Sequence, residues 1–183
     1  MAFCDLLRTT VLLAAGAATV LASVTVIAVA SADDTLTLIV AAVWWTIALV
    51  GGLILGRPAR AAEAMQPLLA QARTATAMPE IGNPTRAALA RLWPIGAFAL
   101  IAGVLGFIFP GVAAIGAGFA LAAALMWRSR EGTVAAIEER DGVRFYVEPG
   151  SALQPVSLIR TPGLRRDRPP PGHPPPPPPT APA

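Results

Sequence analysis

The chain has very few of the residues from which polar active sites are built. Of its 183 residues, one is cysteine, one is histidine and 14% are charged. A single thiol, Cys4, excludes an internal disulfide, a CxxC pair and a cysteine-rich metal site. The only histidine, His173, lies within a proline tract, and no GxSxG, HExxH or Walker pattern occurs. We therefore expect no enzyme activity, no catalytic residue, no cofactor and no metal.

Lysine is absent, so all 14 cationic residues are arginine. Together with abundant alanine, this bias is typical of proteins from GC-rich bacterial genomes. Hydrophobic residues make up 55% of the chain and the mean hydropathy is +0.60. Such a composition indicates an integral membrane protein rather than a water-soluble domain.

The hydrophobic residues are gathered into four uncharged runs. A helix needs about 20 residues to cross the hydrocarbon core of a bilayer, and the sequence predicts spans at residues 9–32, 36–56, 92–109 and 112–127. The expected fold class is an all-α membrane protein with four transmembrane helices, arranged as two antiparallel hairpins. Residues 33–35 form the outer turn of the first hairpin, and this short loop makes its two helices antiparallel neighbours.

The first run has a second interpretation. Ala30, Ser31 and Ala32 fit the A-x-A pattern of a signal-peptide cleavage site. The run is longer than the apolar region of an ordinary signal peptide, and Asp5 cancels the charge of Arg8 in the leader. These features favour a retained anchor over a cleaved leader.

The last two runs form one uncharged stretch of residues 92–127, with "GFIFPGVAAIG" near its centre. One helix of that length would be about 54 Å long, and Pro110 would remove a hydrogen bond near its middle. Phe109 is biased towards extended geometry and Gly111 accepts a tight turn, so residues 110–111 are expected to form an outer turn. Because both arms are short, a re-entrant hairpin is the alternative to two full spans.

The arginines predict the orientation. Residues 1–8, the loop 57–91 and the residues after 127 contain every arginine and lie on one side of the four predicted spans. By the positive-inside rule this side is the cytoplasm, which predicts a multi-pass protein of the bacterial plasma membrane with both termini inside.

Two helical features are expected within the loop 57–91. Met65, Leu68, Leu69 and Ala72 repeat at helical spacing, which predicts a short amphipathic segment on the membrane surface, kinked or interrupted at a proline. Further on, "NPTRAALARLW" has Asn83 as a candidate N-cap and a proline at the first helical position, so a helix should start there.

The segment 128–164 is expected to form a small cytoplasmic β-hairpin. Asp141–Gly142 is a two-residue turn signal, and direct pairing across it would set Glu139 opposite Arg144 and Ile137 opposite Tyr146. The alternative continues the fourth helix through Glu139. "PVSLIRTPG" can add a further strand, and the Arg/Pro-rich residues 165–183 are expected to be a disordered, polyproline-like tail.

Two sets of candidate site residues follow from these spans. Small residues at four-residue spacing let helix backbones approach closely, and we favour packing within one chain over a dimer interface. The predicted packing residues are Gly52, Gly56, Ala102, Gly106, Ala114 and Gly118, and Ala122 extends the row. Arginine and tryptophan at span ends contact anionic lipid headgroups; these residues are Arg57, Arg60, Arg91, Trp93, Trp127, Arg128 and Arg130. Trp44 and Trp45 lie mid-span and are expected to pack against other helices or to face lipid.

No ionisable residue lies within the four runs, which argues against a transporter with an intramembrane charge. Thr19, Ser23, Thr25, Thr37 and Thr46 supply only hydroxyls, which we expect to be structural. The expected function is an accessory membrane protein that binds anionic lipid, recruits a protein partner through its cytoplasmic tail or self-associates, and does not bind nucleic acid. The alternative is an oligomeric, holin-like pore former or a transporter subunit.

The run "IEERDGVRFYVEPGSALQPVSLIRTPGL", which follows the two short spans, resembles the uncharacterised small multi-span membrane proteins of high-GC actinobacteria. The resemblance covers about a third of the chain. It implies a membrane protein and implies no activity and no site.

Overall fold

The computed structural model describes residues 1–74, 84–148, 154 and 156–162. Most of the described chain is helical. The elements are α1 (Phe3–Ser31), α2 (Thr35–Leu55), α3 (Pro58–Ala70), β1 (Arg73–Thr74), α4 (Pro84–Gly106), α5 (Pro110–Asp141), β2 (Val143–Val147) and β3 (Leu158–Pro162).

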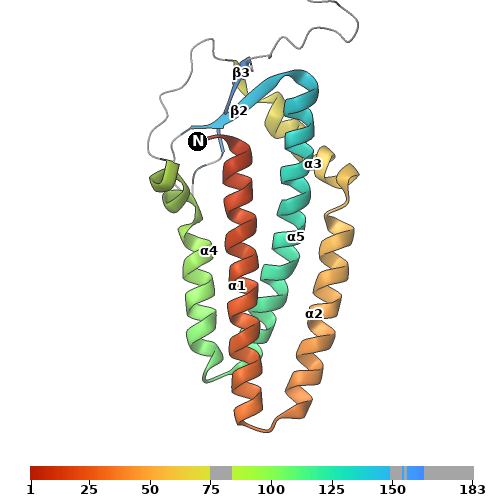
Figure 1. Ribbon diagram of the computed structural model, residues 1–183, viewed down its shortest axis with the longest axis vertical. Helices are drawn as coiled ribbons and strands as arrows, with labels where there is room; N and C mark the ends of the chain where they lie inside the picture. Colours follow the sequence, from red (N-terminus) through yellow and green to blue (C-terminus); the bar gives the residue numbers. More distant parts are fainter. Residues whose placement is uncertain (75–83, 149–153, 155, 163–183) are drawn as a thin grey trace, which may run out of the picture.

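The helices α1, α2, α4 and α5 run side by side along the long axis of the molecule (Figure 1). The α1–α2 and α4–α5 connections both lie at one end, at the bottom of Figure 1, whereas α3, the strands and the N-terminus lie at the other. We call the second end the capped end. The helices α1, α2, α4 and α5 each contain a stretch long and apolar enough to cross a membrane, which indicates a multi-pass membrane protein.

The last helix is the common partner of the other three long helices. α5 packs against α1 most extensively and also contacts α2, α3 and α4. α1 and α2 are antiparallel, as expected from their short loop, but they touch each other little, because both rest on α5. The first hairpin is therefore held together mainly through α5.

The packing faces of these helices are narrow. Along α1 the buried side chains recur every three or four residues: Phe3, Leu6, Leu7, Thr10, Ala14, Ala18, Leu21, Thr25 and Val29. α2 buries only Ala41, Ala48 and Gly52, and leaves its large apolar side chains exposed. This distribution suits helices that pack through small residues and present large ones to lipid.

Leu21 lies at the centre of the bundle and is fully buried. It forms a cluster with Ala102 of α4 and with Ala113 and Ala117 of α5, and we call this cluster the bundle core. A methyl group added at Gly116 would lie 3.1 Å from Leu21 Cδ1. The side chain of Leu21 therefore packs into a depression on α4 and α5 that is lined by alanine and glycine.

Asp34 begins α2 as its N-cap. Its carboxylate accepts hydrogen bonds from the backbone N–H and the hydroxyl of Thr37. These bonds favour the charged form and hold the pKa of Asp34 below its ordinary value, the Thr37 hydroxyl being the main cause. The cap orients the start of α2 in the short α1–α2 connection.

The chain reverses near the centre of the uncharged stretch, as expected, but not through a Pro-Gly turn. α4 ends at Gly106, Phe109 is extended with φ −127° and ψ 86°, and Pro110 is already the first residue of α5. The prediction that residues 110–111 form the turn is therefore wrong by a few residues. Proline is suited to the first helical position because the N–H that it lacks has no partner there.

A small mixed sheet covers the capped end. β3 lies between β1, with which it is parallel, and β2, with which it is antiparallel. The free edge of β2 pairs with the N-terminus: Ala2 bridges Tyr146, and the N–H of Val147 donates to the carbonyl of Met1 at 3.0 Å. The first residues of the chain thus complete a sheet formed by its last described strands.

The predicted hairpin at Asp141–Gly142 is wrong. α5 continues to Asp141, so Glu139 and Ile137 are helical and do not pair with Arg144 and Tyr146. Gly142 has φ 63° and donates its N–H to the carbonyl of Glu138, which is a left-handed helix stop. The same glycine conformation suits a two-residue hairpin, and here it ends the helix instead. The alternative, a helix continuing through Glu139, is correct, and so is the further strand within "PVSLIRTPG".

One hydrophobic cluster joins nearly all elements of the capped end, and we call it the cap core. Its buried members are Phe3, Leu6, Leu7, Met65, Leu92, Val134, Val143, Phe145 and Leu158. The amphipathic helix α3 contributes Met65 to this cluster, so its apolar face packs on protein. The prediction placed this face on a bilayer surface. Pro67 lies inside α3 and does not end the helix. The predicted N-cap Asn83 and the predicted tail 165–183 lie outside the described residues.

The bundle core generates a test of stability. We expect Leu21→Ala to lower the free energy of unfolding by about 2 to 4 kcal/mol, because the rigid Ala/Gly depression cannot close around the lost volume. Thermal unfolding or steric trapping in detergent micelles measures the change. The matched control is Leu12→Ala on the same helix, since Leu12 is 65% exposed; equal losses in both variants would contradict the packing described.

Candidate functional site

The predicted packing residues of α2 lie against α5. A methyl group added at Gly52 would lie 3.0 Å from the backbone Cα of Ala122 and 3.0 Å from Leu125 Cδ1. At Gly56 it would lie 3.2 Å from the carbonyl oxygen of Leu125. Both glycines therefore allow the α2 backbone to approach α5 closely, near the capped end.

Two tryptophans hold the middle of α2 to α5. The indole N–H of Trp45 donates to the carbonyl of Ala114 at 2.9 Å, and that of Trp44 donates to the carbonyl of Ile115 at 3.3 Å. A helix carbonyl has a second lone pair free for such a bond, and an indole N–H in an apolar region needs a partner. These two indole N–H groups thus hold the middle of α2 against the backbone of α5.

Gly118 makes room for this contact. A methyl group there would lie 2.8 and 2.9 Å from Cδ1 and Cε2 of Trp44. The Trp44 ring also meets Phe119 edge to face, with ring centroids 5.4 Å apart. The predicted packing residue therefore accommodates the Trp44 ring.

Three further predicted packing residues lie at the contacts of α4 and α5. Ala102 is buried in the bundle core and Ala114 is buried beneath Trp45. A methyl group added at Gly106 would come within 3.1 Å of Val24 Cγ1 on α1 and still closer to Ala113 of α5. All six predicted packing residues thus sit at contacts between helices of this one chain.

The hydroxyls of the apolar helices bond locally. Those of Thr19, Ser23, Thr25 and Thr46 each donate to the carbonyl four residues earlier, and that of Thr37 donates to Asp34. Within the described part of the chain, no buried side-chain nitrogen or oxygen lacks a hydrogen-bond partner. These hydroxyls do not combine into a polar path through the bundle.

The residues predicted to contact lipid headgroups fall into two groups. Arg57, Arg60, Arg128 and the indole of Trp93 are exposed where the apolar stretches meet the capped end. The others also bond within the protein: Arg91 donates to the carbonyl of Gln154 at 3.4 Å, and the guanidinium of Arg130 lies 4.6 Å from the ring centroid of Trp127, which packs on the cap core. The first group is free to meet lipid, whereas the second also stabilises the capped end.

Glu138 ties three elements of the capped end together. Its carboxylate accepts the backbone N–H of Phe145 at 2.9 Å and the thiol of Cys4 at 3.4 Å. Phe145 belongs to β2, Cys4 to α1 and Glu138 to α5, so one side chain links α5 to both β2 and the start of α1. Its role is to position the sheet over the helices.

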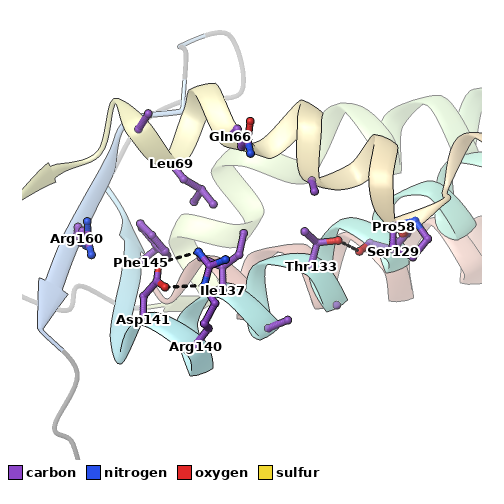
Figure 2. Close-up of a pocket in the computed structure, with 14 residues that line it drawn as sticks. Pro58, Gln66, Leu69, Ser129, Thr133, Ile137, Arg140, Asp141, Phe145 and Arg160 are labelled. Atoms are coloured by element: carbon purple, nitrogen blue, oxygen red, sulfur yellow. Dashed lines mark hydrogen bonds and ion pairs between the residues drawn. The ribbon is translucent and has the colours of Figure 1, made fainter.

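A groove of about 790 Å³ lies between α3 and the second half of α5 (Figure 2). Its apolar lining includes Ala62, Leu69, Ile137 and Phe145. One end lies at Pro58 and Ser129, and the other end lies at Arg140, Asp141 and Arg160. We call it the α3–α5 groove.

The charges of the groove are confined to the end near the sheet. Arg140 pairs with Asp141 at 2.8 Å, and Arg160 lines the same end of the groove. Two guanidinium groups and one carboxylate leave a net charge of +1. The arrangement can hold an anion, and it contains no nucleophile paired with a base. Among the described residues, no group of three His, Cys, Asp or Glu side chains is placed to bind a metal ion.

Sequence reasoning did not find the groove or the linking role of Glu138. Both depend on α5 continuing to Asp141, which brings Glu138 beside Cys4 and α3 beside Ile137. The helical spacing of Val134 and Ile137 was the available signal, and the Asp-Gly turn motif outweighed it.

The contact of Trp44 with Gly118 provides a second test. We expect Gly118→Val to lower the free energy of unfolding by about 1 to 3 kcal/mol, because the added side chain must displace the indole from α5. Thermal melting in micelles measures the change. Gly51→Val is the control, since a methyl group there meets nothing within 4 Å; a similar loss in the control would show that valine in a helix, and not the clash, is responsible.

Removing the Glu138 link provides a third test. We expect Glu138→Ala to destabilise the capped end by about 1 to 3 kcal/mol, because the N–H of Phe145 loses its acceptor. Hydrogen exchange at Phe145 should become faster while exchange in the bundle core stays unchanged. Glu138→Gln retains an acceptor oxygen and should recover most of the protection; equal exchange in all three proteins would refute the link.

Comparison of the sequence and structure with known proteins identifies no similar protein. No family model matches the chain, and neither the curated proteins nor the solved structures yield a match. We therefore infer the function from the residues of this chain alone.

Proposed function

We propose that this protein is an adaptor of the bacterial plasma membrane, with both termini in the cytoplasm, which recruits a protein partner to the membrane through its capped end and tail. The arginines support this orientation. In sequence, every arginine falls in residues 1–8, in the loop 57–91 or after residue 127, which are the segments that adjoin the capped-end side of the four apolar stretches, whereas the α1–α2 connection contains Asp33 and Asp34. The inverted orientation would carry all 14 arginines across the membrane.

The observation that carries the proposal is the continuity of α5. At about 1.5 Å per residue, its 32 residues are about 48 Å long, so it reaches well beyond the apolar stretch into the capped end. There α3, β2 and the first turns of α1 pack on it around the cap core. The capped end is thereby a rigid extension of the membrane helices, which suits a platform for a partner.

An oligomeric pore former is the second candidate, and one observation favours it. A groove of about 630 Å³ runs between α1 and α2 over α5, and its lining includes Thr19, Ser23 and Trp45. Several copies could line a path with such grooves. Against this, both hydroxyls already bond to carbonyls of α1, so we rank the adaptor first.

Capture of a partner by three forms of the protein tests the proposal. Full-length chain, a chain ending at residue 162 and a chain ending at residue 127 are crosslinked in membranes of the source bacterium, purified and analysed by mass spectrometry. We expect one specific protein to co-purify with the full-length chain and to be lost from the shortest form. The form ending at 162 keeps β2 and β3, and therefore distinguishes recruitment by the tail from recruitment by the capped end.

Two further results would overturn the adaptor. One is a reporter fused to the carboxyl terminus that is active only outside the cytoplasm. The other is conduction of ions by the pure protein in liposomes together with identical co-purification from all three forms. Conduction that is abolished by Thr19→Leu would establish the pore former instead.

A further inference from the structure

The α3–α5 groove has a distinct pattern of charge along its length. Its charged residues are Arg140, Asp141 and Arg160, and all three lie at the end near the sheet. Arg140 is paired with Asp141, and among the described residues Arg160 has no ion pair, so Arg160 is the main cationic group that this end offers to a ligand. The net charge of +1 favours an occupant with one negative charge at that end.

The rest of the lining is uncharged and mostly apolar, with the polar side chains of Gln66, Ser129 and Thr133 among the apolar residues. Leu69 of α3 and Ile137 of α5 are partly buried, and Phe145 closes the end near the sheet. The small residues Ala62, Gly132 and Ala136 widen the middle of the groove. Its volume of about 790 Å³ is within the range of sites that bind small organic ligands, roughly 300 to 1,000 Å³.

The uncharged end opens beside the apolar part of the bundle. Pro58 follows the end of α2 by three residues, and Ser129 follows Trp127 by two. The exposed arginines Arg57 and Arg128 flank this end in sequence. This end of the groove therefore adjoins the apolar part of the bundle, and the opposite end is cationic.

We propose that the α3–α5 groove binds a single-chain anionic amphiphile, a long-chain fatty acid, with its alkyl chain along Leu69 and Ile137 and its carboxylate at Arg160 and Arg140. The distance from Ser129 to Arg140, eleven residues of α5, is about 16 Å, which suits an extended alkyl chain. This ligand is additional to the proposed recruitment of a protein and does not depend on it.

Two other occupants fit less well. The residues that follow β3 include Arg165, Arg166 and Arg168, so the chain's own tail would bring positive charge to a positive end. A phospholipid carries two chains, whereas the groove offers one strip between two helices. A fatty acid matches both the charge and the shape.

Photolabelling of the full-length protein tests this site. The protein is placed in nanodiscs of phosphatidylcholine with palmitate carrying a diazirine group in its chain, irradiated and digested, and the labelled peptides are identified. We expect label on residues 58–70 of α3 and 129–141 of α5. Unlabelled palmitate should displace it about three- to fivefold better than methyl palmitate, the difference expected for one exposed ion pair.

Three variants separate the groove from general lipid contact. Arg160→Gln should lower labelling about three- to fivefold. Gly132→Leu should lower it about tenfold or more, because the new side chain fills the groove; a methyl group at Gly132 meets nothing within 4 Å, so the fold should be retained. Arg144→Gln is the matched control: Arg144 is exposed on β2 and does not line the groove, and its labelling should be unchanged.

Several results would overturn the proposal. Labelling that is equal in Gly132→Leu and the unchanged protein would place the ligand elsewhere. Equal displacement by palmitate and methyl palmitate would show that the arginines do not recognise the carboxylate. Displacement by phosphatidylglycerol as effective as that by palmitate would assign the groove to a two-chain phospholipid, and displacement only by an acidic amphipathic peptide would assign it to a protein partner. None of these results would by itself overturn partner capture by the full-length chain, so the two proposals fail independently.

Discussion

Close approach of helix backbones to α5 is the constraint on which the rest of the structure depends. Helices in a membrane gain little from burying apolar surface, because lipid is as apolar as leucine, so they associate through dense packing and a few hydrogen bonds. α5 supplies both. Its small residues receive Leu21 from α1 and the Trp44 ring from α2, and two of its carbonyls accept indole N–H groups. The other long helices are arranged around the surface that these residues create.

The same helix decides what lies beyond the bundle. Because α5 does not stop where its apolar stretch ends, the cap core forms on its second half, with Val134 fully buried among residues from α1, α3 and the strands. The bundle and the capped end therefore share one continuous element. This sharing is the physical basis for treating the capped end as a platform and for the groove beside it.

Much of this arrangement follows from sequence. Long uncharged runs predicted four membrane-length helices, and Pro110 correctly indicated a reversal, because composition and proline chemistry act locally. What could not be predicted depends on tertiary contacts. Gly142 has the same backbone conformation in a hairpin and at a helix end, and only packing around Val134 decides between them. The bonds of Trp44 and Trp45 to α5, and the α3–α5 groove, likewise require knowledge of which helices are neighbours.

The pairing of Met1 and Ala2 with β2 has a consequence for how the protein is made. The ribosome releases α1 long before α5 and β2, so the first helix must wait for most of the chain before it finds its main partner. A truncated translation product would lack the strand that secures the amino terminus, and its first helix would expose Phe3, Leu6 and Leu7, which the finished protein buries. The pairing of the first residues with β2 therefore forms only after α5 and β2 have been made.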